Sequence, residues 1–372
     1  MSASPTSPPA HLLWLQALRT PEQTLQWTLA DWERVVRLAR RLRLLARLAE
    51  SLAAAGMINE VPAQPRRHLV SEQRLSHWRT AAMVWVLERV AITLGDGDYP
   101  LVLLKGGAYI GQNLPIAAGR LPSDVDLLVP KAHIAEAQSR LRAAGWLEAE
   151  LDEHDQRYYH EWSHEVPPMT HPVHTMELDL HHNIQPPVAR MRVDADVLLQ
   201  RLAPSKWAAW QVLAPIDQVL HSAVHLFQDS ELRDRLRDLV DLDGLMRHFS
   251  AHDPRFWVDL PARAASLGLS EPLALACHFC HRWLQTPIPA DTLAEIEAAG
   301  PGRLKRVWLL PLLAQVLTPT EPDGDPSAMQ GVAAALLLVR HHYGRMPLRL
   351  LIPHTWHKMR PPKMATDVLD KP

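Results

Sequence analysis

Cysteine is nearly absent from this 372-residue sequence, and neither sign of charge is in excess. Two cysteines exclude a disulfide-stabilised scaffold and are typical of a reducing compartment. The 39 basic side chains are balanced by 41 acidic ones, which gives a formal net charge of −2. This balance excludes a protein that binds nucleic acid through bulk electrostatics, because no surplus of Lys and Arg is available to neutralise phosphates.

Long apolar runs are also absent. The longest apolar stretches, at 307–317 and 333–339, fall short of the roughly 20 residues that cross a bilayer. The first nine residues lack the charged and apolar regions of a signal peptide. The length predicts two or three domains, and the 47% hydrophobic content is sufficient for a large core. We therefore expect a cytoplasmic, multi-domain protein without membrane insertion.

Hydrophobic periodicity divides the chain into five parts. Helical spacing predicts one helix over 28–57 and another over 71–94, and a later helix over 231–249 with Ser230 as its N-cap. We expect a disordered leader at 1–10, an N-terminal helical segment at 11–95, an α/β core at 96–187, a helical domain at 188–318, and a loop, helix and loose tail at 319–372.

The core differs from its flanks because short apolar runs replace the helical pattern. Runs at 100–104, 124–129, 146–151 and 176–181 predict four strands, with helical spacing between them. The fold class is therefore α+β (α/β), with a small sheet between an N-terminal helical segment and a C-terminal all-helical region.

Two aspartates on one predicted strand are the most informative feature of the core. Asp124 and Asp126 are separated by two positions, so both carboxylates point to one face of the strand. Two carboxylates about 4 Å apart repel by roughly 4 kcal/mol at an effective dielectric near 20. A divalent cation removes this repulsion, and oxygen ligands suit Mg²⁺ or Mn²⁺. The alternative is a pair of solvent-facing aspartates on an edge strand.

The surroundings of the aspartate pair favour the metal hypothesis. Gly106 and Gly107 form a turn that opens a helix, where free N–H groups and the helix dipole favour phosphate. Lys105 precedes this turn, and Arg120 and Ser123 flank the aspartates, so all three are candidate phosphate contacts.

A third carboxylate follows from the same alternation further along the chain. Glu177 and Asp179 share one face of their predicted strand, and Asp179 is therefore a candidate ligand in a two-metal site. His181 shares that face and is placed to contact substrate or orient Asp179.

Together these motifs resemble a known family. The Lys-Gly-Gly turn, Arg120, the segment SDVDLLV and the later ELDLHH are similar to bacterial nucleotidyltransferases of the DNA polymerase β superfamily. More specifically, they resemble the uncharacterised nucleotidyltransferase family found near exopolysaccharide gene clusters. Residues 215–246 are similar to the helical region of that family, and the likeness covers about 78–290.

The resemblance implies a mixed sheet and a role for each motif. Asp124, Asp126 and Asp179 would bind Mg²⁺ or Mn²⁺, and Asp179 would aid deprotonation of the acceptor. Gly106 and Gly107 would cradle the triphosphate, although the superfamily's usual second residue is Ser, so the hydroxyl that often touches the γ-phosphate is missing. The implied reaction transfers a nucleoside monophosphate from an NTP and releases pyrophosphate.

Several alternatives stay open at this point. The acceptor is a small molecule, glycan, protein or RNA, and a role in exopolysaccharide synthesis is one expectation. A toxin-like nucleotidyltransferase that modifies tRNA or protein is a second possibility. A non-catalytic nucleotide-binding scaffold is a third. Nothing in the sequence specifies the base, the acceptor or the oligomeric state.

Three weaker patterns have simpler explanations. Cys277 and Cys280 match a haem-attachment pattern, but their helical context predicts two core thiols. His221 and His225 are one helical turn apart without the Glu of a zinc protease motif, which predicts core histidines near the site. Seven histidines lie within 154–182 with no assigned role. The balanced Arg and Asp residues of 231–247 predict a solvated, salt-bridged face, with an Arg lent to substrate as the alternative.

Overall fold

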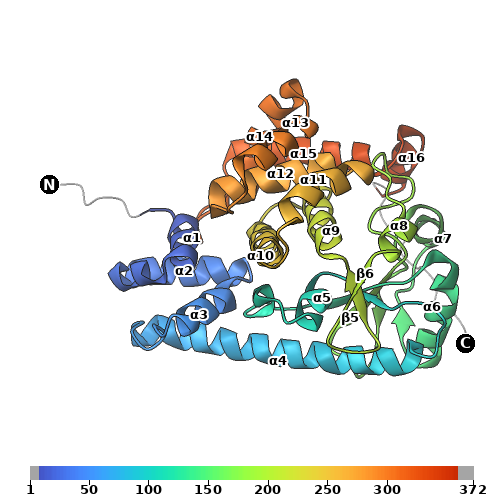
Figure 1. Ribbon diagram of the computed structural model, residues 1–372, viewed down its shortest axis with the longest axis horizontal. Helices are drawn as coiled ribbons and strands as arrows, with labels where there is room; N and C mark the ends of the chain where they lie inside the picture. Colours follow the sequence, from blue (N-terminus) through green and yellow to red (C-terminus); the bar gives the residue numbers. More distant parts are fainter. Residues whose placement is uncertain (1–7, 359–372) are drawn as a thin grey trace, which may run out of the picture.

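The computed structural model describes residues 8–358 (Figure 1). Residues 1–7 of the expected leader and the tail beyond 358 lie outside the described residues. The helices are α1 Ala10–Arg19, α2 Leu29–Arg41, α3 Leu45–Ala54, α4 Ala63–Leu94, α5 Lys105–Gly111, α6 Ile134–Ala143, α7 Glu153–Arg157, α8 Ala195–Leu199, α9 Pro215–Phe227, α10 Leu236–His252, α11 Phe256–Ser266, α12 Ser270–Phe279, α13 Ala290–Ala299, α14 Arg303–Leu317, α15 Ala328–Arg345 and α16 Leu348–Lys358. The strands are β1 Val102–Leu103, β2 Asp124–Leu128, β3 Leu147–Glu148, β4 Met169–Thr170, β5 Glu177–His181, β6 Leu202–Pro204 and β7 Gln211–Leu213.

The seven strands form one mixed sheet in the order β3-β4-β5-β2-β1-β7-β6. β2 runs parallel to β5 and antiparallel to β1, and β1 runs parallel to β7. The expected α+β class is confirmed, with helices at both ends of the chain around a mixed sheet. All four predicted strands are present, but β4, β6 and β7 were missed because, unlike β1 and β3, these strands of two or three residues do not lie in a longer apolar run. The sheet therefore continues beyond residue 187.

Among the N-terminal helices, α4 packs against the sheet, and α1, α2 and α3 pack on one another and on α4. The long helix α4 extends along the lower edge of Figure 1 and contacts α2, α3, α6 and β2. The prediction of a single helix over 28–57 was wrong. Arg43 adopts φ +58°, which ends α2 and lets α3 start in a new direction. Thr28 and Asp31 form a capping box at the start of α2, with Thr28 as the N-cap.

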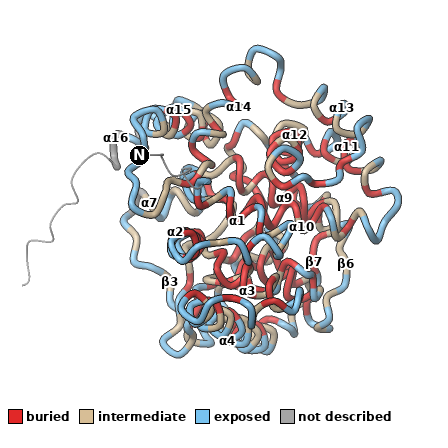
Figure 2. The backbone as a smooth tube through the Cα atoms, turned by 90° about the vertical axis from the view of Figure 1, so that its left-hand side faces the viewer, coloured by how far each residue is buried: buried red, intermediate tan, exposed pale blue. Residues whose placement is uncertain are grey.

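The C-terminal helices surround α9 and α10. Figure 2 shows buried residues concentrated in α9, which contacts α10, α11 and α12. Cys277 and Cys280 are free and buried here, which confirms the expectation of core thiols. No helix among residues 8–358 is long and apolar enough to cross a membrane.

The start of α10 differs from the expected helix over 231–249. α10 begins only at Leu236, and Ser230 does not cap it. Asp229 accepts hydrogen bonds from the Glu231 backbone and the Arg235 guanidinium, and Asp234 adopts φ +58°. These local bonds compete with helix formation and leave 229–235 as a loop.

The contact between α15 and the end of α9 contains a histidine whose protonation lowers the stability of the fold at acid pH. The Nδ1 atom of His341 donates to the Gln228 carbonyl at 2.7 Å. Burial, followed by the charge of Arg345, lowers the pKa of His341 to about 4. A histidine near pKa 6.5 in the unfolded chain therefore takes up its proton before the folded one does, and stability falls as the pH drops.

We therefore expect the contribution of His341 to lower the free energy of unfolding of the wild type by about 1–2 kcal/mol between pH 7 and pH 5. His341→Gln should show a smaller loss over the same interval, measured as the free energy of unfolding in urea. The exposed His160→Gln serves as a control. An identical pH dependence in wild type and His341→Gln would contradict the assignment.

Candidate active site

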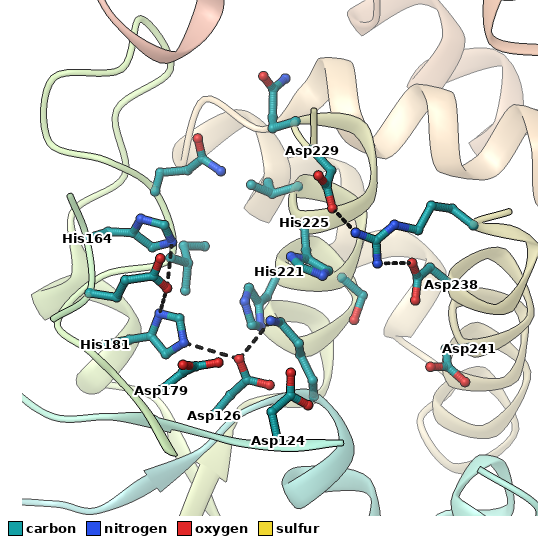
Figure 3. Close-up of a pocket in the computed structure, with 18 of the residues that line it drawn as sticks. Asp124, Asp126, His164, Asp179, His181, His221, His225, Asp229, Asp238 and Asp241 are labelled. Atoms are coloured by element: carbon teal, nitrogen blue, oxygen red, sulfur yellow. Dashed lines mark hydrogen bonds and ion pairs between the residues drawn. The ribbon is translucent and has the colours of Figure 1, made fainter. Parts of the chain in front are cut away.

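A polar pocket of about 440 Å³ lies between the sheet and the helices α9 and α10 (Figure 3). Its size falls within the range of about 300–1,000 Å³ that is usual for small-molecule sites. Its walls carry seven carboxylates, six cationic side chains and four histidines. The pocket therefore suits a charged ligand.

The register of β2 and β5 brings the three predicted carboxylates together. Asp126 pairs with Asp179 across the two parallel strands, and Asp124 lies two positions away on the same face. All three line the pocket. Asp126 is buried, whereas Asp124 and Asp179 are half-buried. Two adjacent strands thus present three carboxylates to one space, as the alternation predicted.

Asp126 is held by two partners. Its Oδ1 accepts from Lys105 Nζ at 2.8 Å and from His181 Nε2 at 3.2 Å. Burial alone would raise the pKa of Asp126, but the Lys105 charge and the His181 hydrogen bond hold it well below its usual range. Burial alone would lower the pKa of Lys105, and Asp126 raises it. Asp126 is therefore a carboxylate and Lys105 an ammonium at neutral pH.

Asp179 has no hydrogen-bonded cation to offset the cost of burying its charge. It makes no hydrogen bond or ion pair with any residue in the described part of the chain. Burial and then the charge of Asp126, with smaller contributions from Glu165 and Asp124, raise its pKa to about 7, although the nearby His181 acts in the opposite direction. The site thus contains one carboxylate whose charge is left for a bound cation to neutralise. Three hard oxygen donors of this kind suit Mg²⁺ or Mn²⁺.

The Lys-Gly-Gly turn is built around Arg120. Lys105 adopts φ +42°, an unusual conformation for a residue with a side chain, directly after β1. A Cβ on Gly106 would collide with the Arg120 guanidinium, so glycine is required there by close packing. Gly107 faces Leu103 at ordinary contact distance. Neither glycine is among the residues that line the pocket.

The predicted phosphate contacts occupy different positions. Lys105, Arg120 and Ser123 all line the pocket. Lys105 contacts a carboxylate, as described, and Arg120 Nε donates to Asp241 at 2.9 Å. The hydroxyl of Ser123 donates to Asp124 at 3.1 Å. The structure thus uses all three to hold carboxylates.

Arg43 is a pocket residue that sequence reasoning missed. It lies at the break between α2 and α3, and its guanidinium donates to Ser123 Oγ at 3.4 Å. Among the described residues no carboxylate lies within ion-pair distance of it. Burial, followed by repulsion from Arg237, lowers its pKa. Arg43 is therefore a cation in the pocket without an anionic partner. Nothing in the continuous helical pattern around it indicated this position.

The face expected to be solvated on 231–247 is instead buried against the pocket. Asp238, Asp241 and Asp243 are buried. Their partners are arginines, as the charge balance predicted: Asp241 pairs with Arg120, and Asp238 with Arg235 at 3.5 Å. Periodicity could not show that this helix packs against a polar cavity. The Arg120–Asp241 pair connects α10 to the segment before β2, whereas the Asp238–Arg235 pair lies within the start of α10.

The two histidines of α9 face the same pocket, His221 buried and His225 half-buried. His221 and His225 both line it, which is consistent with their expected place near the site. Burial, followed by the charge of Lys105, lowers the pKa of His221 to about 3 and lowers that of His225 strongly. Both histidines are therefore neutral, and the charges next to them are those of the Lys105–Asp126 ion pair.

Further pocket residues come from segments that no motif singled out. His164 and Glu165 precede β4, and Arg345 ends α15. Arg345 donates to the Tyr158 hydroxyl at 2.7 Å. His164 belongs to the histidine-rich stretch, which was the only signal for it. His181 lies on the predicted face and contacts Asp126.

A family model described as "Uncharacterised nucleotidyltransferase" matches residues 28–285, more than two thirds of the chain. The match begins at α2, well before the likeness expected from residue 78. It includes every pocket segment except Arg345. No curated protein and no solved structure matches the chain.

The uncompensated charge of Asp179 leads to a stability prediction. Asp179→Asn should stabilise the metal-free protein at pH 8 by about 1–3 kcal/mol, because it removes repulsion from Asp126 and desolvation of a charge. Mg²⁺ or Mn²⁺ should raise the melting temperature of the wild type more than that of the variant. Differential scanning fluorimetry with chelator and with metal measures both effects. A variant less stable than wild type in chelator would contradict the charge argument.

Proposed function

Because this chain belongs to the uncharacterised nucleotidyltransferase family, we propose that its pocket transfers a nucleoside monophosphate from an NTP to an acceptor. The acceptor oxygen forms a bond to the α-phosphorus, and the bond between that phosphorus and the bridging oxygen to the β-phosphate breaks. Pyrophosphate leaves. The observation that carries the proposal is the convergence of Asp124, Asp126 and Asp179 on one space beside an unpaired arginine.

The donor set suits a divalent cation. Asp124, Asp126 and Asp179 would hold Mg²⁺ or Mn²⁺, because they supply hard oxygen ligands and Asp179 has no partner of its own. Such an ion supplies charge neutralisation at the phosphates during transfer. We extend the family assignment to the DNA polymerase β superfamily on the same motifs, SDVDLLV and ELDLHH.

The chain's own residues position the reactants. Lys105 and His181 fix the orientation of Asp126, so that its carboxylate is preorganised before substrate arrives. Asp179 faces the same space as Asp124 and Asp126 and is placed to accept the proton of the acceptor hydroxyl. Arg43 faces the pocket with its charge unpaired and is placed to contact the triphosphate.

The first test removes the aspartate pair. Asp124→Asn combined with Asp126→Asn should abolish transfer and the metal-dependent thermal shift by ATP, GTP, CTP or UTP. Saturation at about a hundredfold excess over Kd stabilises the folded wild type by about 2.7 kcal/mol, which is a visible shift. The matched control is Asp96→Asn with Asp98→Asn, a pair at the same spacing on an exposed turn.

The screen identifies the nucleotide and separates the alternatives. A shift lost only in the site variant supports the proposal and directs a search among small-molecule, glycan, protein and RNA acceptors. Binding without turnover on any acceptor would favour a nucleotide-binding scaffold. Full turnover by the site variant, or no shift with any of the four nucleotides, would refute the proposed site.

A second test concerns Arg43. Arg43→Ala should weaken NTP binding by about tenfold or more, because one charge-assisted contact to phosphate is lost. Arg43→Lys should recover part of this loss. The effect should fall mainly on KM or Kd for the nucleotide, measured by titration. The exposed Arg74→Ala provides a control of equal charge change. Equal affinities in Arg43→Ala and wild type would exclude a phosphate contact.

A further inference from the structure

A second group of donors lines the same pocket. His164, Glu165 and His181 place one ligand atom each within 4.8 Å of one another. Glu165 Oε2 is 3.2 Å from His181 Nδ1 and 3.9 Å from His164 Nε2 (Figure 3). These three residues are distinct from the three aspartates and share no ligand with them.

The backbone holds the group in place. Glu165 forms a bridge with His181, and the His182 N–H donates to the His164 carbonyl at 2.8 Å. The Val166 N–H donates to the Leu180 carbonyl at 3.0 Å. These main-chain hydrogen bonds hold the segment 164–166 beside the end of β5. The donors are positioned by main-chain hydrogen bonds, as a preformed binding site requires.

Polar atoms in this group lack partners. Nδ1 of His164 and Nδ1 of His181 are buried and have no hydrogen-bond partner among the described residues. The His181 Nδ1 and the Glu165 carboxylate are close, but the pair lacks the geometry of a hydrogen bond. The other nitrogen of His164, Nε2, lies 3.9 Å from the Glu165 carboxylate, so His164 presents a ligand atom to this group.

The other nitrogen of His181 completes a familiar arrangement. Its Nε2 donates to Asp126, and a histidine that binds a metal through one nitrogen usually donates the other to a carboxylate. Two imidazoles and one carboxylate are a donor set that favours zinc and related transition metals over Mg²⁺. With three protein ligands, one coordination position stays open toward the pocket.

We propose that His164, Glu165 and His181 bind one divalent transition-metal ion of the zinc class beside the aspartate site. Binding at Nδ1 places the His181 proton on Nε2 and so orients Asp126. In the absence of this ion, the alternative is a His181 imidazolium that bridges Glu165 and Asp126. The two alternatives differ in stoichiometric metal content, which is independent of whether the protein transfers nucleotides.

The test titrates ZnCl₂ into the full chain after chelator treatment and dialysis. We expect one tight equivalent for the wild type by calorimetry and by metal analysis. His164→Ala and Glu165→Gln should each weaken binding by more than the roughly 10–100-fold that loss of an outer-shell partner costs. Co²⁺ substitution should give visible absorption bands that both variants lose. Thermal unfolding of each variant shows whether it is folded.

Three controls separate the site from others. His160→Ala removes an exposed histidine in the same segment and should leave zinc binding unchanged. His248→Ala removes a half-buried histidine whose ring lies 4.2 Å from that of the exposed His252, and should also leave the tight equivalent unchanged. Asp124→Asn should retain zinc even if it abolishes nucleotide binding. Zinc binding that is substoichiometric, unaffected by both ligand variants, or lost in His248→Ala would overturn the proposal.

Discussion

The buried contact of Lys105 with Asp126 is the interaction on which the site depends. Their 2.8 Å ion pair allows a fully buried carboxylate to stay charged in the middle of the sheet. Loss of one partner would leave the other as an unpaired buried charge, which costs several kcal/mol. Lys105 makes this contact from a backbone conformation with φ +42°, which is unusual for a residue with a side chain. His181 donates a second hydrogen bond to Asp126 and, through its other nitrogen, lies next to Glu165.

A second set of ion pairs connects the helices to this centre. Arg120 pairs with Asp241 of α10 and lies against the ring of Tyr109 at 5.4 Å. Gly106 leaves the space that Arg120 occupies. Because the Arg120–Asp241 pair is buried and charge-assisted, it holds α10 against the segment that leads into β2. The sheet and both helical parts of the chain therefore all contribute residues to the pocket.

Much of the aspartate site was predictable, because strand alternation is a local property. Asp124, Asp126 and Asp179 each stand on a strand with clear period-two spacing. Arg43 and Glu165 were not predictable in this way, because their roles depend on a helix break and on an isolated strand contact. The burial of Asp238 was missed for a related reason, since charge balance does not reveal which side of a helix meets a cavity.

The sequence by itself determined the central strands β2 and β5 and the faces of their side chains, together with the residue types that suit phosphate and metal chemistry. Hydrophobic spacing and the DxD pattern act over a few residues, so they can be evaluated without a fold. Only the tertiary structure decided which cation neutralises which carboxylate. That choice pairs Lys105 with Asp126 and Arg120 with Asp241 and leaves Arg43 and Asp179 without partners. Such pairing depends on distances between distant segments, and Coulomb energy and desolvation at those distances are absent from the linear chain.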